Sequence, residues 1–369
     1  MKRENKPPSQ ATKKFLSKFI RLIFGIMVLF FIMWRLYRVF IVNDAYGVDI
    51  WVRLAISGLI IGGVYSLIAI GYTLVYGILL MINFAHGELM MLGSFAGYFV
   101  FEITNAIIVP TAEDPKMTFL NAYPVLSIII SFLVGMGTSA LIGFLLEKIA
   151  YRPLRKAPRL IPLISAIGAS FFLQNAAQLL FNPQTRNYIN PDLLARGKGW
   201  SFMINDSAVT VPYTGIFTLV LSILLMVGLL LIVKRTRLGK SMRAVAMDKD
   251  TSALMGIDVN QTISNTFIIS GSLAGAAGVM WGLHNGIVNF FIGFIPGIKA
   301  FTAAVLGGIG NIPGAMLGGM LLGIIESIGP TALDISYQLK DVIAFAIMIA
   351  ILIFKPSGIL GEVLSEEKV

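Results

Sequence analysis

Long apolar segments are the feature that most constrains how this sequence can fold. Residues 54–101 carry no charged side chain apart from Glu88. A helix that crosses the hydrocarbon core of a bilayer takes about 20 residues, so this segment is long enough for two crossings and too long for one. Similar apolar segments recur along the chain, at residues 124–146, 161–181, 213–233 and 342–354. The sequence therefore predicts a protein that crosses a membrane many times.

The amino-acid composition excludes a soluble protein. Of the 369 residues, 56% are hydrophobic and 13% are charged, and the mean hydropathy is +0.82, whereas ordinary soluble domains are about 25% charged. The segments are continuously apolar and do not alternate as transmembrane strands do. The transmembrane segments are therefore expected to be helices, because in lipid each backbone N–H and C=O group must be paired within its own segment.

Basic residues predict how the chain is oriented. The net charge of +10 comes from Lys and Arg residues that cluster between apolar segments, at residues 2–21, 148–159 and 234–249. Such clusters mark cytoplasmic loops. All three lie in the cytoplasm if an additional helix within residues 22–42 crosses the membrane, which also places the N-terminus there. With two short crossings or half-helices in residues 296–329, the count is about ten crossings and the C-terminus is cytoplasmic.

Glycines at four-residue spacing predict tight packing between the helices. This spacing leaves one face of a helix without bulk, so that two backbones can approach closely. The pairs are Gly58/Gly62, Gly93/Gly97, Gly271/Gly275, Gly278/Gly282, Gly314/Gly318 and Gly319/Gly323. The predicted fold is thus an all-α polytopic membrane protein, a bundle of about ten transmembrane helices, some of them short or broken.

Polar residues interrupt the first long apolar segment at Asn83, His86 and Glu88. Ionisable groups at membrane depth are costly and usually face protein or water. The interruption is therefore either a structural break between two crossings or part of a solute pathway. The predicted topology places it at the cytoplasmic end of the first of the two crossings, as a turn near an inner gate. Glu88 is favourable at the N-terminus of the next helix.

Two further polar residues, Lys299 and Thr302, lie within a later apolar segment. Together with Asn83, His86 and Glu88, they are the candidates for a translocation route or its gates. The alternative for each is a role in packing or helix capping.

The sequence shows no residue set typical of an enzyme, a metal centre or a nucleotide site. It has no cysteine, and its two histidines, His86 and His284, lack the helical His-x-x-x-His spacing of a zinc site. Leu238-Gly-Lys-Ser241 resembles the end of a phosphate-binding loop, but Lys234 occupies the position of the required upstream glycine. We expect no cofactor, no metal and no catalytic residue, and ATP hydrolysis would take place in a partner.

Residues 240–256 predict an amphipathic cytoplasmic helix. Apolar residues such as Met242 and Val245 are interspersed with charged ones such as Arg243, and Gly256 can adopt the left-handed conformation that ends a helix. One interpretation is a helix that lies on the membrane surface through its basic face. The other is a docking helix for a cytoplasmic subunit, and the residues alone favour neither.

Several long motifs resemble a known family of membrane proteins. They are Gly71-Tyr-Thr-Leu-Val-Tyr-Gly77, Met81-Ile-Asn-Phe-Ala-His-Gly-Glu88, Tyr151-Arg-Pro-Leu-Arg155 and Lys299-Ala-Phe-Thr-Ala-Ala-Val-Leu-Gly-Gly-Ile-Gly310. These stretches strongly resemble the permease subunits of branched-chain amino acid ABC transporters, most closely the LivH-type subunit. Pro313-Gly-Ala-Met316 and Lys355-Pro-Ser-Gly-Ile-Leu-Gly361 extend the resemblance to residues 50–361.

The resemblance implies a transport subunit and not an enzyme. The expected assembly imports leucine, isoleucine and valine across a bacterial-type cytoplasmic (inner) membrane. It would contain a second permease subunit, homologous or identical, two cytoplasmic ATP-binding subunits and an extracytoplasmic solute-binding protein. The expected permease domain spans residues 47–361. A basic cytoplasmic tail and an additional transmembrane helix in residues 1–46 precede it, and a short cytoplasmic tail, residues 362–369, follows.

The resemblance also implies that the cytoplasmic loop couples the permease to the ATPase, which favours the docking interpretation. The expected coupling residues are Arg243, Ala246, Ala253, Gly256 and Ile257. Two alternatives stay open for the function. One is an ABC permease for urea or short amides, and the other is a stand-alone channel or secondary transporter. A channel needs no docking helix, and a secondary carrier usually has coupling-ion carboxylates in its spans.

Overall fold

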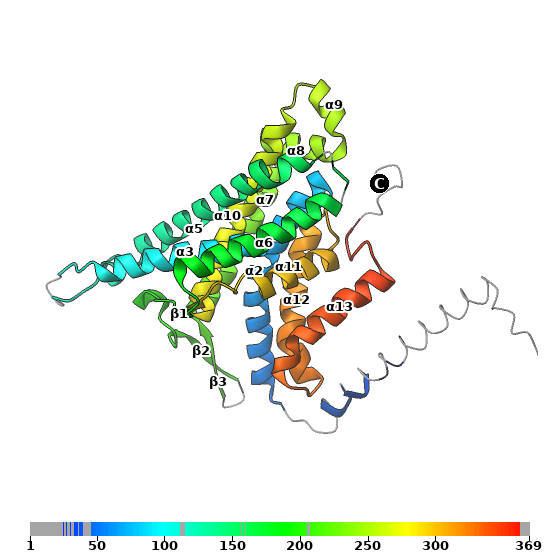
Figure 1. Ribbon diagram of the computed structural model, residues 1–369. Helices are drawn as coiled ribbons and strands as arrows, with labels where there is room; N and C mark the ends of the chain where they lie inside the picture. The colour runs from blue at the N-terminus through cyan, green and yellow to red at the C-terminus, as the bar shows by residue number, and fades with distance from the viewer. Residues whose placement is uncertain are drawn as a thin grey trace, which may run out of the picture.

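The protein folds as a bundle of long helices with two small antiparallel sheets (Figure 1). The computed structural model describes residues 25, 27, 30, 33–35, 37–39, 46–110, 115–155, 157–158, 160–204 and 207–361. The basic N-terminal tail, most of the additional first helix and the C-terminal tail 362–369 lie outside the described residues. The boundaries proposed for those parts stay predictions.

The long helices follow one another through the described chain with few interruptions. In order they are α2 (Val48–Leu79), α3 (His86–Ala106), α5 (Pro124–Leu146), α6 (Leu160–Phe181), α7 (Tyr213–Arg235), α10 (Val259–Asn285), α11 (Phe294–Gly307), α12 (Ile312–Ala332) and α13 (Lys340–Phe354). The shorter elements are α4 (Phe119–Ala122), the π-helix η2 (Glu147–Tyr151), η3 (Arg152–Leu154), β1 (Arg186–Asn187), η4 (Asp192–Leu194), β2 (Gly199–Ile204), β3 (Ser207–Pro212), α8 (Arg237–Met247), α9 (Lys249–Leu254), β4 (Ile287–Val288) and η5 (Tyr337–Leu339).

The helices have the lengths and composition of membrane spans. Within the described residues, seven helices are long and apolar enough to cross a membrane. The 21-residue α3 and the 14-residue α11 come in addition. At 1.5 Å per residue, α11 is about 21 Å long, shorter than the hydrocarbon core of about 30 Å. The prediction of a polytopic helical bundle with some short helices is confirmed.

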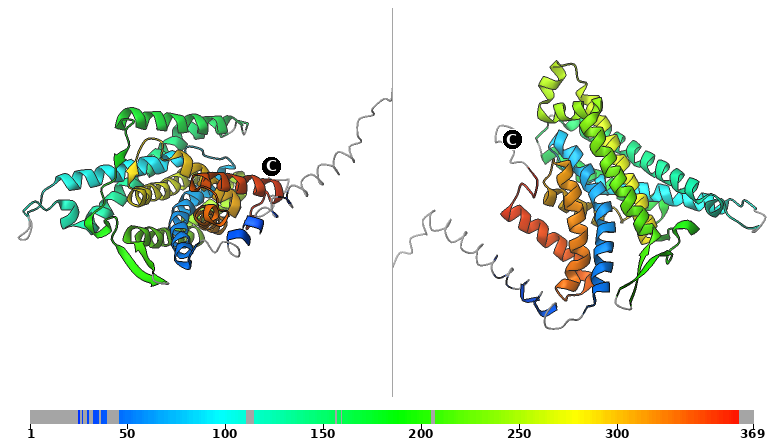
Figure 2. Two further views of the ribbon diagram at one scale, coloured as in Figure 1. Left: turned by 90° about the horizontal axis from the view of Figure 1, so that it is seen from below. Right: turned by 180° about the vertical axis from the view of Figure 1, so that it is seen from behind.

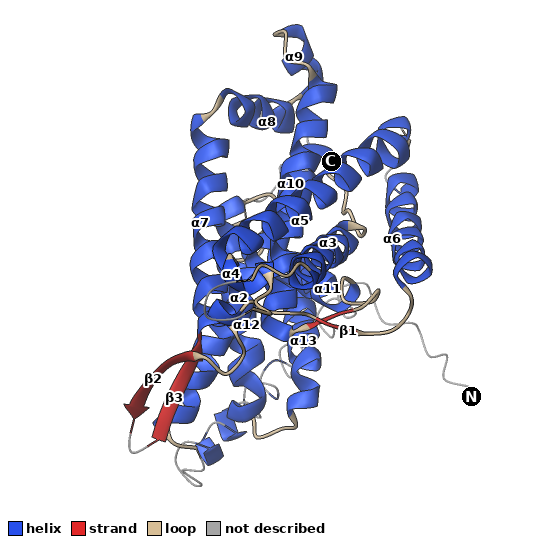
Figure 3. Ribbon diagram, turned by 90° about the vertical axis from the view of Figure 1, so that its left-hand side faces the viewer, coloured by secondary structure: helices blue, strands red, loops and turns tan. Residues whose placement is uncertain are grey.

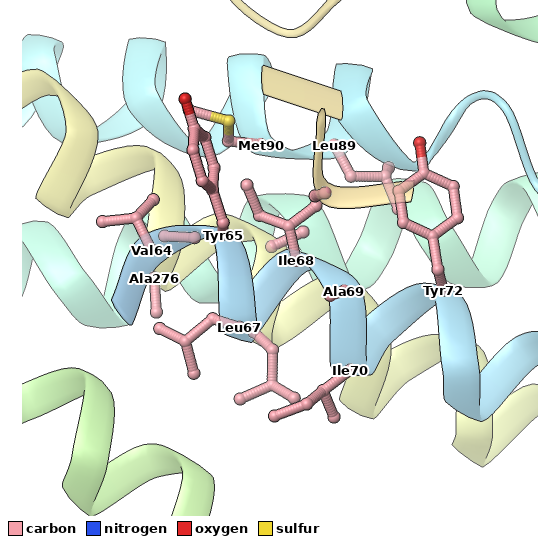
Figure 4. Close-up of a cluster of buried hydrophobic side chains, with 14 of the residues drawn as sticks. Val64, Tyr65, Leu67, Ile68, Ala69, Ile70, Tyr72, Leu89, Met90 and Ala276 are labelled. Carbon is pink, nitrogen blue, oxygen red and sulfur yellow. The ribbon is translucent and has the colours of Figure 1, made fainter. Parts of the chain in front are cut away.

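The central helix of the bundle is α2, which packs against α7, α10, α11 and α12. Its middle is covered on every side, since the consecutive residues 67–70 all have 0% exposure. Figure 4 shows these side chains leaving α2 in different directions, among the neighbouring helices. A helix that is apolar all round belongs in the interior of a bundle, and this explains why the segment shows no amphipathic pattern.

The paired glycines lie where helices touch. A Cβ atom on Gly62 would lie 2.9 Å from Met320 Cα in α12, and one on Gly93 would lie 2.4 Å from Gly275 Cα in α10. No ordinary side chain fits at such distances. The close backbone packing predicted from the four-residue spacing is therefore confirmed at these positions.

Two groups of short elements lie at opposite ends of the bundle (Figures 1 and 3). One end carries α8 and α9, which follow α7. The other end carries the β2–β3 hairpin, in which Phe202 pairs with Val209, and the β1–β4 pair, which joins the loop before β2 to the segment after α10.

The helices α6 and α13 lie at the edges of the bundle (Figure 2). In the most apolar 18-residue segment of α6, only 28% of the residues are buried. In the corresponding segment of the span that contains α13, the share is 6%. These two helices therefore present most of their apolar surface outward.

Candidate functional site

The predicted polar turn between α2 and α3 is tied to the end of α5. Asn83 is 1% exposed, and its Oδ1 accepts hydrogen bonds from the Ala85 backbone N–H at 3.1 Å and from the Tyr151 hydroxyl at 2.7 Å. Tyr151 is the last residue of the π-helix η2. Asn83 thus shapes the turn and connects it to a second element, as expected of a buried amide.

His86 lies deeper in the bundle than the sequence predicts. Its ring packs edge-on against Tyr72, with centroids 4.9 Å apart, and a Cβ atom on Gly71 would lie 2.1 Å from its Nε2. Gly71 precedes the last residue of α2, Leu79, by eight positions, which is about 12 Å along the helix axis. The first residue of α3 therefore lies beside the middle of α2. The turn that joins the two helices must bring the chain back along α2 before α3 begins.

Glu88 lies beside a cavity between α3, α6 and α11. The residue is 1% exposed, and its Oε1 accepts a hydrogen bond from the Ser170 hydroxyl at 3.2 Å. Its Oε2 has no hydrogen-bond partner among the described residues. The cavity has a volume of about 200 Å³. The side chains and glycines that line it are Tyr72, Phe84, Gly87, Glu88, Ile167, Ser170, Phe171, Gly293, Phe294, Gly297 and Ile298.

Lys299 is the centre of a buried ion-pair cluster. Its Nζ lies 2.7 Å from Glu326 Oε1 and 2.5 Å from Asp341 Oδ1, and Lys340 Nζ lies 3.6 Å from Glu326 Oε1. The side chains of Lys299 and Glu326 are each 3% exposed. The cluster joins α11, α12 and α13 with two charges of each sign, so that no net charge is buried.

Thr302 lies one turn further along α11 and makes local contacts. Its hydroxyl donates to the Ile298 carbonyl at 3.0 Å and lies 3.3 Å from Met348 Sδ in α13. These contacts are those of a packed helix residue.

The structure brings three of the predicted route residues, His86, Glu88 and Lys299, to two neighbouring places along α2. Tyr72 contacts His86 and lines the Glu88 cavity, while the Lys299 Nζ lies 5.9 Å from the centroid of the Tyr65 ring. Tyr65 and Tyr72 are two helical turns apart, about 10 Å. Figure 4 shows both tyrosines leaving α2 on the same side.

A charged network near the start of α10 was not predicted. Glu147 has 0% exposure and accepts from Arg152, from Arg155 and, at 2.6 Å, from the Ser264 hydroxyl. Arg155 also donates to Asn260 Oδ1 at 2.7 Å. The sequence analysis used this basic cluster only to assign topology. The acid Glu147, five positions before Arg152 and eight before Arg155, was the signal that could have revealed the network.

The loop after α7 forms two helices where one was predicted. Residues 240–256 break at Asp248, whose backbone is extended, with φ −155°. Its carboxylate accepts from the backbone N–H groups of Asp250 and Thr251 and from the Thr251 hydroxyl. Asp248 is therefore the N-cap of α9, and this preference for capping ends α8. The hydrogen bonds from Thr251 and Asp250 hold the pKa of the Asp248 carboxyl below its usual range, so the cap is lost only as the pH falls through that lowered pKa.

The predicted coupling residues face two directions. Arg243 donates to the Val233 carbonyl at the end of α7 and so fixes α8 to that helix. Ala246, Ala253 and Gly256 are exposed, whereas Ile257 is partly buried against the core. Gly256 has φ +84°, which confirms the left-handed turn after α9.

The most exposed apolar side chains of this loop were not among the predicted residues. They are Met247, Leu254 and Met255, at 73%, 88% and 79% exposure. The loop lies near the charged network, since burial and the neighbouring Arg155 guanidinium lower the pKa of Lys249. Exposed apolar residues on a charged helical tip mark a surface for another protein.

Comparison with known proteins gives a consistent result. The family model described as "Branched-chain amino acid transport system / permease component" matches residues 54–352. The high-affinity branched-chain amino acid transport system permease protein BraD of Pseudomonas aeruginosa is 44% identical over 83% of this chain and 94% of its own length. The corresponding permease protein LivH of Escherichia coli K12 is 40% identical over the same shares. No solved structure matches this chain significantly.

Proposed function

The chain belongs to the family of branched-chain amino acid transport permease components, and from this premise we propose that it carries leucine, isoleucine and valine into the cytoplasm. It is the membrane-spanning permease component of an ABC importer, a transport subunit and not an enzyme. The observation that carries the choice of substrate is the 44% and 40% identity, across nearly the whole length of each relative, to two permeases named for branched-chain amino acids.

The proposed assembly places ATPases at the end of the bundle that carries α8 and α9. Met247, Leu254 and Met255 supply an apolar tip of the size that a groove on a cytoplasmic ATP-binding subunit would bury. Arg243 and Ile257 anchor the loop to the bundle, and the Glu147 network lies behind it. Movement of the ATPases is thereby passed to α7 and α10.

A solute-binding protein outside the cell and a second permease subunit complete the proposed importer. The extracytoplasmic side is the end that carries the β2–β3 hairpin, and both termini are cytoplasmic in a bacterial inner membrane. ATP binding shifts the equilibrium between two states of the permease only if the ATP-bound partner subunits favour one state over the other. The loop from α8 to Ile257 is the element that passes this preference to the bundle.

The proposed route passes the two polar places along α2. His86 and Glu88 lie at one, with Asn83 in the turn just before them, and Lys299 lies at the other, with Thr302 one turn further along α11. In each place a charged or polar group is enclosed by protein, as expected for groups that act within a membrane.

Uptake of radiolabelled leucine tests the proposal. The chain would be expressed with its partner subunits in cells that lack branched-chain amino acid importers. We expect uptake that needs ATP and the binding protein, and that excess isoleucine or valine inhibits. Uptake of urea or acetamide, but not of leucine, would assign the alternative substrate class. Leucine flux without the ATPase subunits would indicate a channel or secondary carrier.

A further inference from the structure

The Glu88 cavity carries an inference about how the substrate is recognised within the membrane. It lies where two helices begin. Gly87 is in the first turn of α3, and Gly293 is the residue before α11. A Cβ atom on Gly87 would lie 2.4 Å from the Gly293 carbonyl oxygen, and one on Gly297 would lie 3.0 Å from Gly87 Cα. These glycines allow the two helix starts to touch.

Both helix starts carry positive potential into the cavity. The dipole of each helix makes its N-terminal end favourable for an anion, although the N–H groups of Glu88, Leu89, Phe294 and Gly297 already donate to backbone carbonyls. Such ends of short helices are suited to binding a carboxylate inside a membrane protein. A helix start alone would not define a site, but a second observation points to a ligand here.

That observation is the free oxygen of Glu88. The residue is 1% exposed, its Oε2 has no partner among the described residues, and Oε2 lies against Gly293, where an added Cβ would be 2.9 Å away. Glu88 is also the only acidic or basic side chain among the described residues that line the cavity. A role as a cap for α3 does not account for it, since its side chain accepts a hydrogen bond from Ser170 in α6 and α3 has no side-chain cap.

The remaining walls are apolar. Ile167 and Phe171 come from α6, and Ile298 comes from α11. The cavity volume of about 200 Å³ exceeds the roughly 150 Å³ that accommodates benzene in a protein interior. An aliphatic side chain of moderate size therefore fits.

We propose that this cavity is a binding site for the zwitterion of an apolar amino acid on its way through the permease. Glu88 Oε2 accepts the ammonium group, the positive ends of the α3 and α11 dipoles stabilise the carboxylate, and Ile167, Phe171 and Ile298 surround the aliphatic side chain. Ser170 orients the Glu88 carboxylate. The inference deepens the proposed function and rests on it for the choice of amino acid.

Protection of an engineered cysteine tests the site. Because the chain has no cysteine, an Ile167→Cys variant carries one reporter in this subunit. Maleimide modification of that subunit is followed in membranes that contain the assembled transporter. Leucine should slow the modification. Isocaproate, which lacks the ammonium group, and isoamylamine, which lacks the carboxylate, should each need at least about tenfold higher concentrations, the loss expected for one charge-assisted hydrogen bond.

Glu88→Gln in the same background identifies the acid. It should raise the half-protecting concentration of leucine about tenfold and remove the difference between leucine and isocaproate. Glu102→Gln, at an exposed position on the same helix, should change neither quantity. If Glu88→Gln does not reach the membrane, Ser170→Ala supplies the test, with weaker leucine protection expected.

Any one of three results overturns the site. The first is equal protection by the three compounds, and the second is leucine protection that Glu88→Gln or Ser170→Ala leaves unchanged. The third is equal protection of a Phe172→Cys reporter, because Phe172 faces outward at 70% exposure in the wild type.

Failure of the site and failure of the function are separate results. If wild-type cells take up leucine but the Ile167→Cys reporter is not protected, the cavity assignment fails and the function stands. If leucine is not taken up and another zwitterion protects, the function fails and the site stands.

Discussion

At the scale of single residues, Lys299 shows how the bundle accommodates a charge in its interior. The ammonium group lies between Glu326 of α12 and Asp341 of α13 and above the Tyr65 ring of α2. Four helices therefore meet at one cation. Removing the cation leaves the Glu326 carboxylate buried, with only the partly exposed Lys340 ammonium 3.6 Å away, which is far more costly than replacing the whole pair by apolar residues.

We expect Lys299→Met to destabilise the protein by about 3–5 kcal/mol. Adding Glu326→Leu should restore at least half of that loss, because the buried carboxylate is then absent. The apparent Tm of the detergent-solubilised protein measures both. Lys234→Met, at an exposed position, is the control and should have little effect. Equal Tm values for Lys299→Met and wild type would show that the cluster does not stabilise the fold.

The residues also show what the sequence could and could not predict. The polar positions 83, 86, 88 and 299 stand out in apolar surroundings, so they were found. Their partners Ser170, Glu326 and Asp341 were not assigned, because they lie on other helices and only the packing of α3, α11 and α13 brings them near. The contact between His86 and the middle of α2 was not predicted for the same reason, since nothing within residues 80–85 reveals it.

At the scale of elements, the loop after α7 is built from local signals. Thr236 caps α8 by accepting from the Gly239 N–H, Asp248 caps α9, and Asp258 caps α10 by accepting from the Gln261 N–H. The break at Asp248 was readable in principle, since Asp followed by a polar turn is a helix-start signal. The apolar pattern of residues 240–256 concealed it, because that pattern continues across the break.

Gly256 tests whether the shape of this loop matters for coupling. Its φ of +84° suits glycine alone, although a Cβ atom there would meet no atom within 4 Å. Gly256→Val should therefore strain the turn by about 1–2 kcal/mol without a clash and move α9 away from its docking position. We expect leucine uptake to be lost and the ATPase activity to stop responding to the loaded binding protein.

Gly228→Val is the matched control for this experiment. Gly228 also has open space around its Cβ position, but it lies within α7 and its φ is not positive. The control should reach the membrane and transport as wild type does. Normal uptake by Gly256→Val would contradict a coupling role for the turn.

At the scale of the whole molecule, the bundle carries a different group of short elements at each end. The apolar segments and glycine spacing were enough to predict a tightly packed helical membrane protein, because both depend on lipid and backbone geometry alone. The sequence did not predict the β2–β3 hairpin. Its strands lie in a weakly hydrophobic stretch that mixes apolar pairs such as Phe202 and Val209 with polar pairs such as Ser201 and Thr210.

Sidedness of the two ends is open to direct measurement. In a chain without cysteine, single substitutions Leu254→Cys and Trp200→Cys place reporters on α9 and on the hairpin, at positions 88% and 68% exposed. A membrane-impermeant maleimide should label Trp200→Cys in intact cells and Leu254→Cys only in inverted vesicles. Labelling of both from the same side would contradict the proposed topology.

The contact between Gly87 and Gly293 has a consequence for the biogenesis of the protein. The two glycines touch, yet the ribosome completes α3 long before it reaches α11. Until the second half of the chain has been synthesised and inserted, the Glu88 carboxylate lacks the enclosure that α11 provides. A nascent chain stalled or truncated before Gly293 would thus hold this acidic residue within the bundle with one of its enclosing helices missing.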